Sequence, residues 1–146
     1  MSSSSRPAAT TRIRVVAGAI IRHQTVLIAQ RARSADQAGL WELPGGKVRT
    51  NESDGDALVR ELEEELGIQV SVTGELGISD YDYPHICIRL VGLTATLISG
   101  HPEAREHHAI RWVGPDELQQ LQWSPADIPL LGVLESHLRS LPSEPT

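Results

Sequence analysis

Four glutamates lie close together in the segment ELEEE, at Glu61, Glu63, Glu64 and Glu65. In a helix, Glu61, Glu64 and Glu65 occupy positions i, i+3 and i+4 and therefore share one face. Like charges at this spacing cost about 0.2–0.5 kcal/mol per pair, and the cost grows where water is scarce. We therefore expect a positive group at this face. A hard divalent cation fits, because Mg²⁺ and Mn²⁺ take oxygen ligands.

The residues around the glutamates can supply the rest of such a site. Arg60 can donate a forked pair of hydrogen bonds to a carboxylate and hold it in place. The loop LPGGKV has two glycines where the backbone comes close to a neighbour, and the carbonyl of Gly45 can be a further oxygen ligand. Lys47 is a candidate contact for a phosphate. A glutamate-rich helix is more often a solvated surface, and this loop is what favours a metal site here.

The spacing over residues 46–68 resembles the Nudix box: glycine, five residues, glutamate, seven residues, then Arg-Glu-apolar-any-Glu-Glu-any-Gly-apolar. The chain matches every defined position, with Gly46, Glu52, Arg60, Glu61, Leu62, Glu64, Glu65, Gly67 and Ile68. The resemblance implies an α/β (α+β) fold, an α/β/α sandwich with a central mixed β-sheet in which the box forms loop-helix-loop. It also implies cleavage of a nucleoside diphosphate linked to another group, with Mg²⁺ or Mn²⁺ as cofactor.

By this resemblance, Glu61, Glu64 and Glu65 bind the metal ions together with the carbonyl of Gly45. Glu61 or Glu64 can also accept the proton of the attacking water, and the sequence leaves that choice open. A further carboxylate in this family comes from the loop before the last strand. Glu106 matches its position, and the alternative interpretation is a surface glutamate.

Glu52 and Arg60 correspond to residues that hold the metal-binding glutamates in place. Arg31 resembles a residue that touches the base, although an exposed arginine at a strand end is an equal alternative. Asp127 stands where the enzymes for oxidised guanine carry Asn. An ionised Asp only accepts hydrogen bonds, which favours a base with an exocyclic amine, such as cytosine or adenine. Asp127 can also be an ordinary N-cap of the last helix. The candidate substrate contacts are therefore Arg31, Asp127 and the phosphate contact Lys47.

Within the family, the chain resembles the MutT-type nucleoside triphosphate pyrophosphohydrolases, and among these the bacterial CTP pyrophosphohydrolases, at 30–31, 38–48 and 125–131. This predicts hydrolysis of a (d)NTP to a (d)NMP and diphosphate, with CTP, dCTP or methylated or oxidised nucleotides as substrates. The alternatives are hydrolysis of 8-oxo-dGTP, ADP-ribose or a dinucleoside polyphosphate, and a non-catalytic nucleotide-binding module.

The pattern along the chain predicts the elements that must position these residues. A helix is expected from Ser53, its N-cap, to Gly67, its C-terminal glycine. A second helix over 124–141 has a buried stripe of Leu131, Leu134, Leu138 and Leu141. Residues 33–48 are expected to be a loop. The predicted strands cover 13–22, 26–31, 68–76, 85–98 and 109–114, and the first two form a hairpin.

The composition predicts one acidic domain of the cytoplasm. The 146 residues carry a formal net charge of −6, which argues against binding to nucleic acid or an anionic membrane. No segment is long and apolar enough to span a membrane. We expect a disordered lead-in at 1–11, a domain at 12–141 and a tail at 142–146, in a monomer or homodimer whose partner is a small nucleotide.

Three residues outside the motif receive plain structural interpretations. His107 and His108 have no partner at ligand spacing and are expected at the surface. Cys87 is the single cysteine, so the chain has no internal disulfide, which fits a reducing cytosol. We expect Cys87 in the core of its strand.

Overall fold

A computed structural model describes residues 11–142, so nearly all of the predicted lead-in and tail lies outside the described residues. Within this range the strands are β1 (Ile13–Arg22), β2 (Thr25–Gln30), β3 (Trp41–Glu42), β4 (Gly45–Lys47), β5 (Gln69–Asp82), β6 (Cys87–Ser99) and β7 (Ala109–Val113). The helices are α1 (Asp54–Leu66), α2 (Pro115–Leu118) and α3 (Ile128–Ser140), preceded by the short 3₁₀ helix η1 (Pro125–Asp127).

Strand β1 is the centre of a mixed sheet. It runs parallel to β6 from Ile13 to Ile20, and it pairs antiparallel with β4 through one half and with β2 through the other. β5 and β6 form a long antiparallel hairpin, while β2 also pairs with β3 and β7. One β-branched, apolar strand thereby joins the two parts of the sheet.

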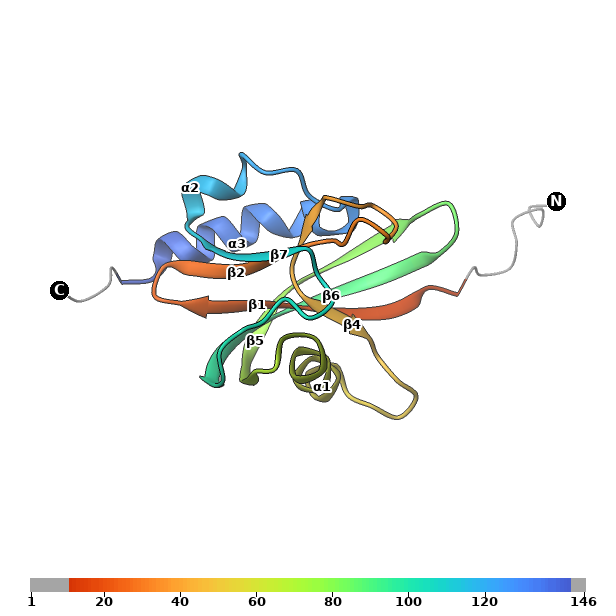
Figure 1. Cartoon of the computed structure of the whole chain (residues 1–146), viewed down its shortest axis with the longest axis horizontal. Helices are drawn as coiled ribbons and strands as arrows, with labels where there is room; N and C mark the ends of the chain where they lie inside the picture. The colour runs from red at the N-terminus through yellow and green to blue at the C-terminus, as the bar shows by residue number, and fades with distance from the viewer. Residues whose placement is uncertain (1–10, 143–146) are drawn as a thin grey trace.

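The helices cover opposite faces of this sheet (Figure 1). α1 packs on one face over a core that includes Leu58, Leu62 and Leu66, whereas α2 and α3 lie on the other face. The second core includes Leu134 and Leu138 of α3. These layers confirm the predicted α/β/α sandwich around a mixed sheet.

Helix α1 begins and ends where the sequence predicts. The hydroxyl of Ser53 accepts a hydrogen bond from the backbone amide of Asp56 at 3.1 Å. Gly67 adopts a φ of 70°, in the left-handed region that glycine tolerates best. Leu58, Leu62 and Leu66 are buried, so this stripe of α1 faces the core.

Several predicted boundaries differ from the observed ones. The expected loop over 33–48 contains the short strands β3 and β4, because β2 and β1 offer backbone partners that a local pattern does not reveal. β5 continues well beyond residue 76, to Asp82. The predicted helix over 124–141 is divided into η1 and α3, and the short helix α2 was not predicted.

The stripe of the last helix is confirmed in its centre and wrong at its end. Leu131, Leu134 and Leu138 are buried, but Leu141 follows the last helical residue and is only partly buried. Cys87 is also misplaced by the prediction, because it begins β6 and is half-buried rather than in the core. Within residues 11–142, no helix has the length and apolar character needed to cross a membrane.

Candidate active site

The loop of two glycines is pressed between β1 and helix α1. Gly45 and Gly46 pair with Ala17 and Val16 of β1. A Cβ atom on Gly45 would overlap the carbonyl group of Val16, and one on Gly46 would overlap the carboxylate of Glu61. Gly45 therefore requires glycine, because the neighbouring group is backbone, whereas a Cβ atom at Gly46 would displace the carboxylate of Glu61. The glycine backbone thus lies directly beside a glutamate of the helix.

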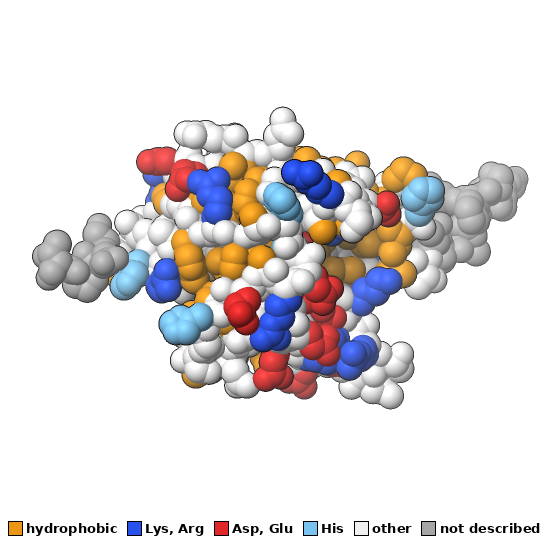
Figure 2. All heavy atoms as spheres, in the orientation of Figure 1, with side chains coloured by type: hydrophobic (Ala, Val, Ile, Leu, Met, Phe, Trp, Pro, Cys, Tyr) orange, Lys and Arg blue, Asp and Glu red, His pale blue; other side chains and the backbone are white. Residues whose placement is uncertain are grey.

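Arg60 holds three carboxylates of this region. Its Nε and Nη2 atoms donate to the two oxygens of Glu52 at 2.8 and 2.9 Å, which is the predicted fork. Its Nη1 atom donates to Glu61 at 2.9 Å and to Glu64 at 3.3 Å. Nη2 also reaches the carbonyl of Lys47 at 3.0 Å, so a single guanidinium joins the loop to the helix. Figure 2 shows acidic side chains gathered over α1 with basic side chains among them.

The fork keeps Glu52 ionised. The hydrogen bonds from Arg60, and then that from the backbone amide of Arg49, lower the pKa of Glu52 to about 2. Glu52 therefore carries its negative charge throughout the physiological range and remains a fixed partner for Arg60.

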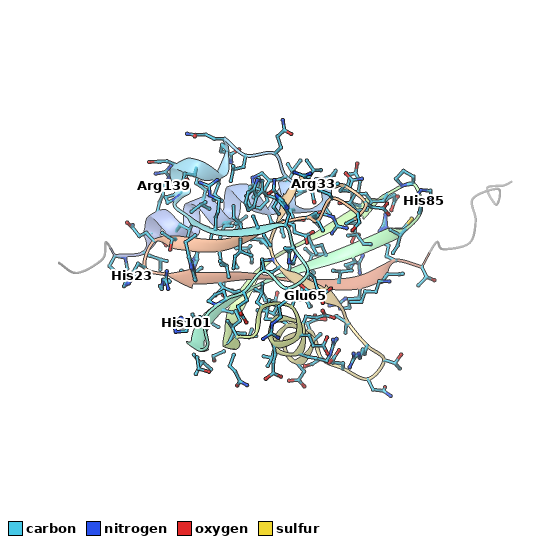
Figure 3. The ribbon with its side chains drawn as sticks, viewed as in Figure 1. His23, Arg33, Glu65, His85, His101 and Arg139 are labelled. Atoms are coloured by element: carbon cyan, nitrogen blue, oxygen red, sulfur yellow. The ribbon has the colours of Figure 1, made fainter. Side chains whose placement is uncertain are left out.

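Glu65 has the opposite environment. Burial is the main cause that raises its pKa to about 8, and the carboxylates of Glu61, Glu106 and Glu42 raise it further. Its Oε1 atom is buried and has no hydrogen-bond partner within residues 11–142. Figure 3 shows Glu65 on the side of α1 that faces the sheet. A half-buried carboxyl group with one unpartnered oxygen, beside other carboxylates, fits a cation as the missing partner of that oxygen.

A pocket of about 400 Å³ connects these residues with the predicted substrate contacts. It is lined by Gly45, Lys47, Glu65, Glu106, Arg31 and Asp127, among others. Glu61 and Glu64 do not line it, and both lie against Arg60 instead. Thus the structure brings six of the predicted site residues to one cavity. The other four, Glu52, Arg60, Glu61 and Glu64, do not line it and form a separate cluster around Arg60.

Asp127 does not cap its helix. Its side chain makes no capping hydrogen bond, and its Oδ2 atom instead accepts the backbone amide of Leu43 at 2.9 Å. Burial first, and the charge of Glu42 second, raise the pKa of Asp127 to about 8. At neutral pH the carboxyl is therefore mostly protonated and can donate as well as accept. The predicted preference for a base with an exocyclic amine took Asp127 as ionised, and the raised pKa argues against that assumption.

Two pocket residues, Glu42 and His107, were not predicted from the sequence to be part of the site. Glu42, at the end of β3, accepts from Arg31 Nη1 at 2.9 Å and lies 3.0 Å from His107 Nε2. The surface interpretation of His107 is wrong, because its side chain is only 8% exposed. His108, by contrast, is exposed as expected. The sequence signal that could have indicated Glu42 is its place beside the glycine loop. The contact between Glu42 and His107 spans 65 positions and has no local sequence pattern.

Tyr83 also lines the pocket, where its hydroxyl accepts the backbone amide of Ala126 at 3.1 Å. Tyr83 lies just beyond β5 and Ala126 in η1, so this bond joins the end of a strand to the segment that carries Asp127.

Comparison with known proteins decides the family. The family described as NUDIX domain matches residues 11–132, most of the chain. The chain belongs to the Nudix family.

Curated Nudix relatives are similar over most of their length. A Mycobacterium tuberculosis protein, provisionally named 8-oxo-dGTP diphosphatase 2, is 46% identical over 117 residues, which are 77% of this chain and 81% of the relative. The Escherichia coli CTP pyrophosphohydrolase is 44% identical over 119 residues, 82% of this chain and 88% of the relative. Among solved structures, the E. coli ORF135 protein superimposes with a TM-score of 0.76 at 42% identity, covering 89% of this chain and 92% of that one. The chain is thus a Nudix hydrolase, and these relatives are named for the hydrolysis of nucleotides.

The Nudix residues fit the divalent metal that this family generally uses. Within residues 11–142, no three His, Cys, Asp or Glu side chains already converge as ligands of an ion. The available donors are nevertheless the carboxylates of α1, Glu106 and a backbone carbonyl, which suit a hard cation. The unpartnered Oε1 atom of Glu65 is the clearest place for a ligand bond.

Proposed function

We propose that this Nudix hydrolase is a Mg²⁺-dependent (Mn²⁺-dependent as the alternative) nucleoside triphosphate pyrophosphohydrolase that converts a (d)NTP and water to a (d)NMP and diphosphate. The pocket carries the proposal, because one cavity contains both Glu65 with Glu106 and Arg31 with Asp127. The first pair suits the metal and the phosphates, and the second suits a polar base.

Each residue has a role that follows from its contacts. Gly45, Glu61, Glu64, Glu65 and Glu106 would hold the metal. When bound, the metal supplies neutralisation of the phosphate oxygens and an acidified water. Glu61 or Glu64 would accept the proton of the attacking water, and in the structure both carboxylates are held by hydrogen bonds from Arg60.

The remaining roles concern charge and position. Lys47 lines the pocket and offers its ammonium group to a phosphate. Glu52 and Arg60 keep the helix and the glycine loop in place through the fork and the bond to the Lys47 carbonyl. Because Glu52 stays ionised to about pH 2, this support does not change over the working range of the enzyme.

For the base, we propose CTP, dCTP or a modified nucleotide. The carboxylate of Glu42 and the guanidinium of Arg31 offer an acceptor and a donor in the pocket. The name of the E. coli relative supports cytosine nucleotides. 8-Oxo-dGTP is the second candidate, because a protonated Asp127 both donates and accepts, as Asn does.

We further propose one domain over 12–141 that acts in the cytoplasm on free nucleotides, as a monomer or homodimer. The family match over 11–132 supports the single domain, and the net charge of −6 argues against nucleic acid as a partner.

A product assay tests the reaction. Purified protein is incubated with Mg²⁺ and normal, methylated or oxidised nucleoside triphosphates, and the products are separated by chromatography. Monophosphate and diphosphate in equal amounts are expected. Turnover of only ADP-ribose or dinucleoside polyphosphates would replace the triphosphate proposal, and no turnover of any nucleotide would favour a non-catalytic binding module.

Replacing Glu64 tests the glutamate helix. Glu64→Gln removes the charge with little change of shape, and we expect kcat to fall at least about 100-fold. The side chain is half-exposed, so the free energy of unfolding should change by no more than about 0.5 kcal/mol. Steady-state kinetics and urea unfolding measure both quantities.

Glu63→Gln is the matched control. Glu63 is on the same helix, but its carboxylate accepts from Gln69 at 2.8 Å, outside the Arg60 cluster. Near-normal turnover is expected for this variant. A Glu64→Gln enzyme as active as the Glu63→Gln enzyme would remove Glu64 from the mechanism.

A further inference from the structure

His107 connects two distant parts of the pocket wall. Its side chain is only 8% exposed, and its Nε2 atom lies 3.0 Å from Oε2 of Glu42. His107 belongs to the loop between β6 and β7, and Glu42 ends β3. Both residues line the pocket, so their contact is part of the wall that a substrate would meet.

With this contact, both carboxylate oxygens of Glu42 have a partner. The other carboxylate oxygen, Oε1, accepts from Arg31 Nη1 at 2.9 Å. Arg31 is anchored in turn, because its Nε atom donates to the carbonyl of Asp36. Glu42 is therefore held on both sides, by a guanidinium and by an imidazole, and its orientation in the pocket depends on both.

The same loop is attached at other points. The backbone amide of His108 donates to the carbonyl of Gln30 at 2.9 Å, beside β2. Further back, the amide of Glu103 donates to the carbonyl of Leu66 at the end of α1. These bonds hold the loop backbone, but none of them reaches Glu42. His107 alone among these residues carries a side-chain contact from the loop to that carboxylate.

We propose that His107 is a positioning residue for nucleotide binding, which holds Glu42, and through Glu42 also Arg31, in the orientation that receives the substrate. In this role Nε2 bears the ring N–H and donates a hydrogen bond to Oε2 of Glu42. The Nδ1 atom is buried and has no hydrogen-bond partner within residues 11–142, so the ring is aligned by its Nε2 contact. This inference rests on the proposed function, in which a nucleotide occupies this pocket.

Two amide substitutions test the role of Nε2. In His107→Gln the side-chain NH₂ can reach Glu42 as Nε2 does, whereas the shorter side chain of His107→Asn cannot. We expect His107→Asn to raise KM roughly tenfold with kcat changed less than about twofold, since a hydrogen bond to a charged group is lost away from the reacting phosphorus. His107→Gln should restore KM to near the wild-type value.

His108→Ala is the control for the loop, because its side chain is exposed and only its backbone bonds to Gln30. It should leave KM and kcat unchanged. A double-mutant cycle then asks whether His107 acts through Glu42: in a Glu42→Ala background, His107→Asn should cause no further rise in KM. Equal KM for the Asn and Gln variants, or additive effects in the cycle, would overturn the proposal.

A spectroscopic measurement separates this inference from the proposed reaction. A long-range ¹H–¹⁵N spectrum of the substrate-free protein should show His107 protonated at Nε2, with ring shifts that move in Glu42→Ala but not in His108→Ala. If Nε2 carries no proton, or if the ring shifts do not change in Glu42→Ala, the inference is overturned even if triphosphates are hydrolysed. If no triphosphate is hydrolysed while the ring shifts behave as expected, the proposed hydrolysis is wrong, but the hydrogen bond from His107 to Glu42 is confirmed.

Discussion

Two glutamates of the Nudix motif respond in opposite ways to their surroundings. Arg60 lowers the pKa of Glu52 to about 2, whereas burial and neighbouring carboxylates raise that of Glu65 to about 8. Glu52 stays charged beside Arg60, whereas Glu65 is the carboxyl group that we propose as a metal ligand. At the residue scale, identical side chains therefore acquire different roles through what lies within hydrogen-bond reach.

Asp127 gives a pH-dependent prediction at the same scale. Because its folded pKa is raised to about 8 from an ordinary value of 3.8, its contribution to stability is fully present below about pH 4 and is lost as pH rises through about 8. The free energy of unfolding should fall by up to about 1.4 kcal/mol per pH unit in that window.

Asp127→Asn should remove this slope, since an amide oxygen can still accept from Leu43 and cannot ionise. Urea unfolding at a series of pH values compares the two proteins. We expect similar stability near pH 4 and a more stable variant near pH 9. Parallel curves would mean that Asp127 ionises normally in the folded protein.

At the scale of elements, the glycines that end or interrupt a helix have different physical roles. Gly67 ends α1 with a φ of 70°, and a Cβ there would also meet the guanidinium of Arg105 at 2.5 Å. Gly132 lies in the exposed part of α3 with open space around it. Gly67 is needed for its backbone conformation, whereas nothing around Gly132 requires a glycine.

Alanine at each glycine should therefore change stability in opposite directions. Gly67→Ala should destabilise the protein by at least about 1 kcal/mol, because a side chain is strained at positive φ. Gly132→Ala should stabilise it by about 0.5–1 kcal/mol, because it removes a glycine from a helix interior. Denaturant midpoints measure both changes. Stabilisation by Gly67→Ala would show that the helix end can relax without its left-handed turn.

At the scale of the whole molecule, metal binding and folding should be linked. A metal that binds only the folded protein stabilises it by about 2.7 kcal/mol at one hundred times its dissociation constant. Mg²⁺ should accordingly raise Tm, and EDTA should reverse the effect. Differential scanning calorimetry with and without Mg²⁺ measures the shift.

Glu65→Gln should weaken this linkage. The raised pKa of Glu65 means that its contribution is lost as pH rises from about 4.5 through about 8, so at pH 9 the metal-free variant should be more stable than the wild type. With Mg²⁺ the order should reverse, because the variant lacks a ligand. Glu63→Gln, outside the cluster, should keep the wild-type response. A full Mg²⁺ shift in Glu65→Gln would exclude Glu65 as a ligand.

The sequence by itself determined the features that depend on neighbours along the chain. Helix α1 has its cap, its terminal glycine and its buried stripe within one short segment, so periodicity and capping predict it. The fork of Arg60 on Glu52 spans eight positions within the same motif. Local spacing was enough to predict the family, the mixed fold and the glutamate cluster.

Only the tertiary structure decided the contacts between distant segments. Glu42 contacts His107 across 65 positions, and Asp127 accepts from Leu43 across 84. Strands β3 and β4 form because they pair with β2 and β1. These contacts bury His107, change the pKa of Asp127 and shape the pocket wall. Burial and charge at a position depend on everything packed around it, and that packing is a property of the whole sheet rather than of any stretch of sequence.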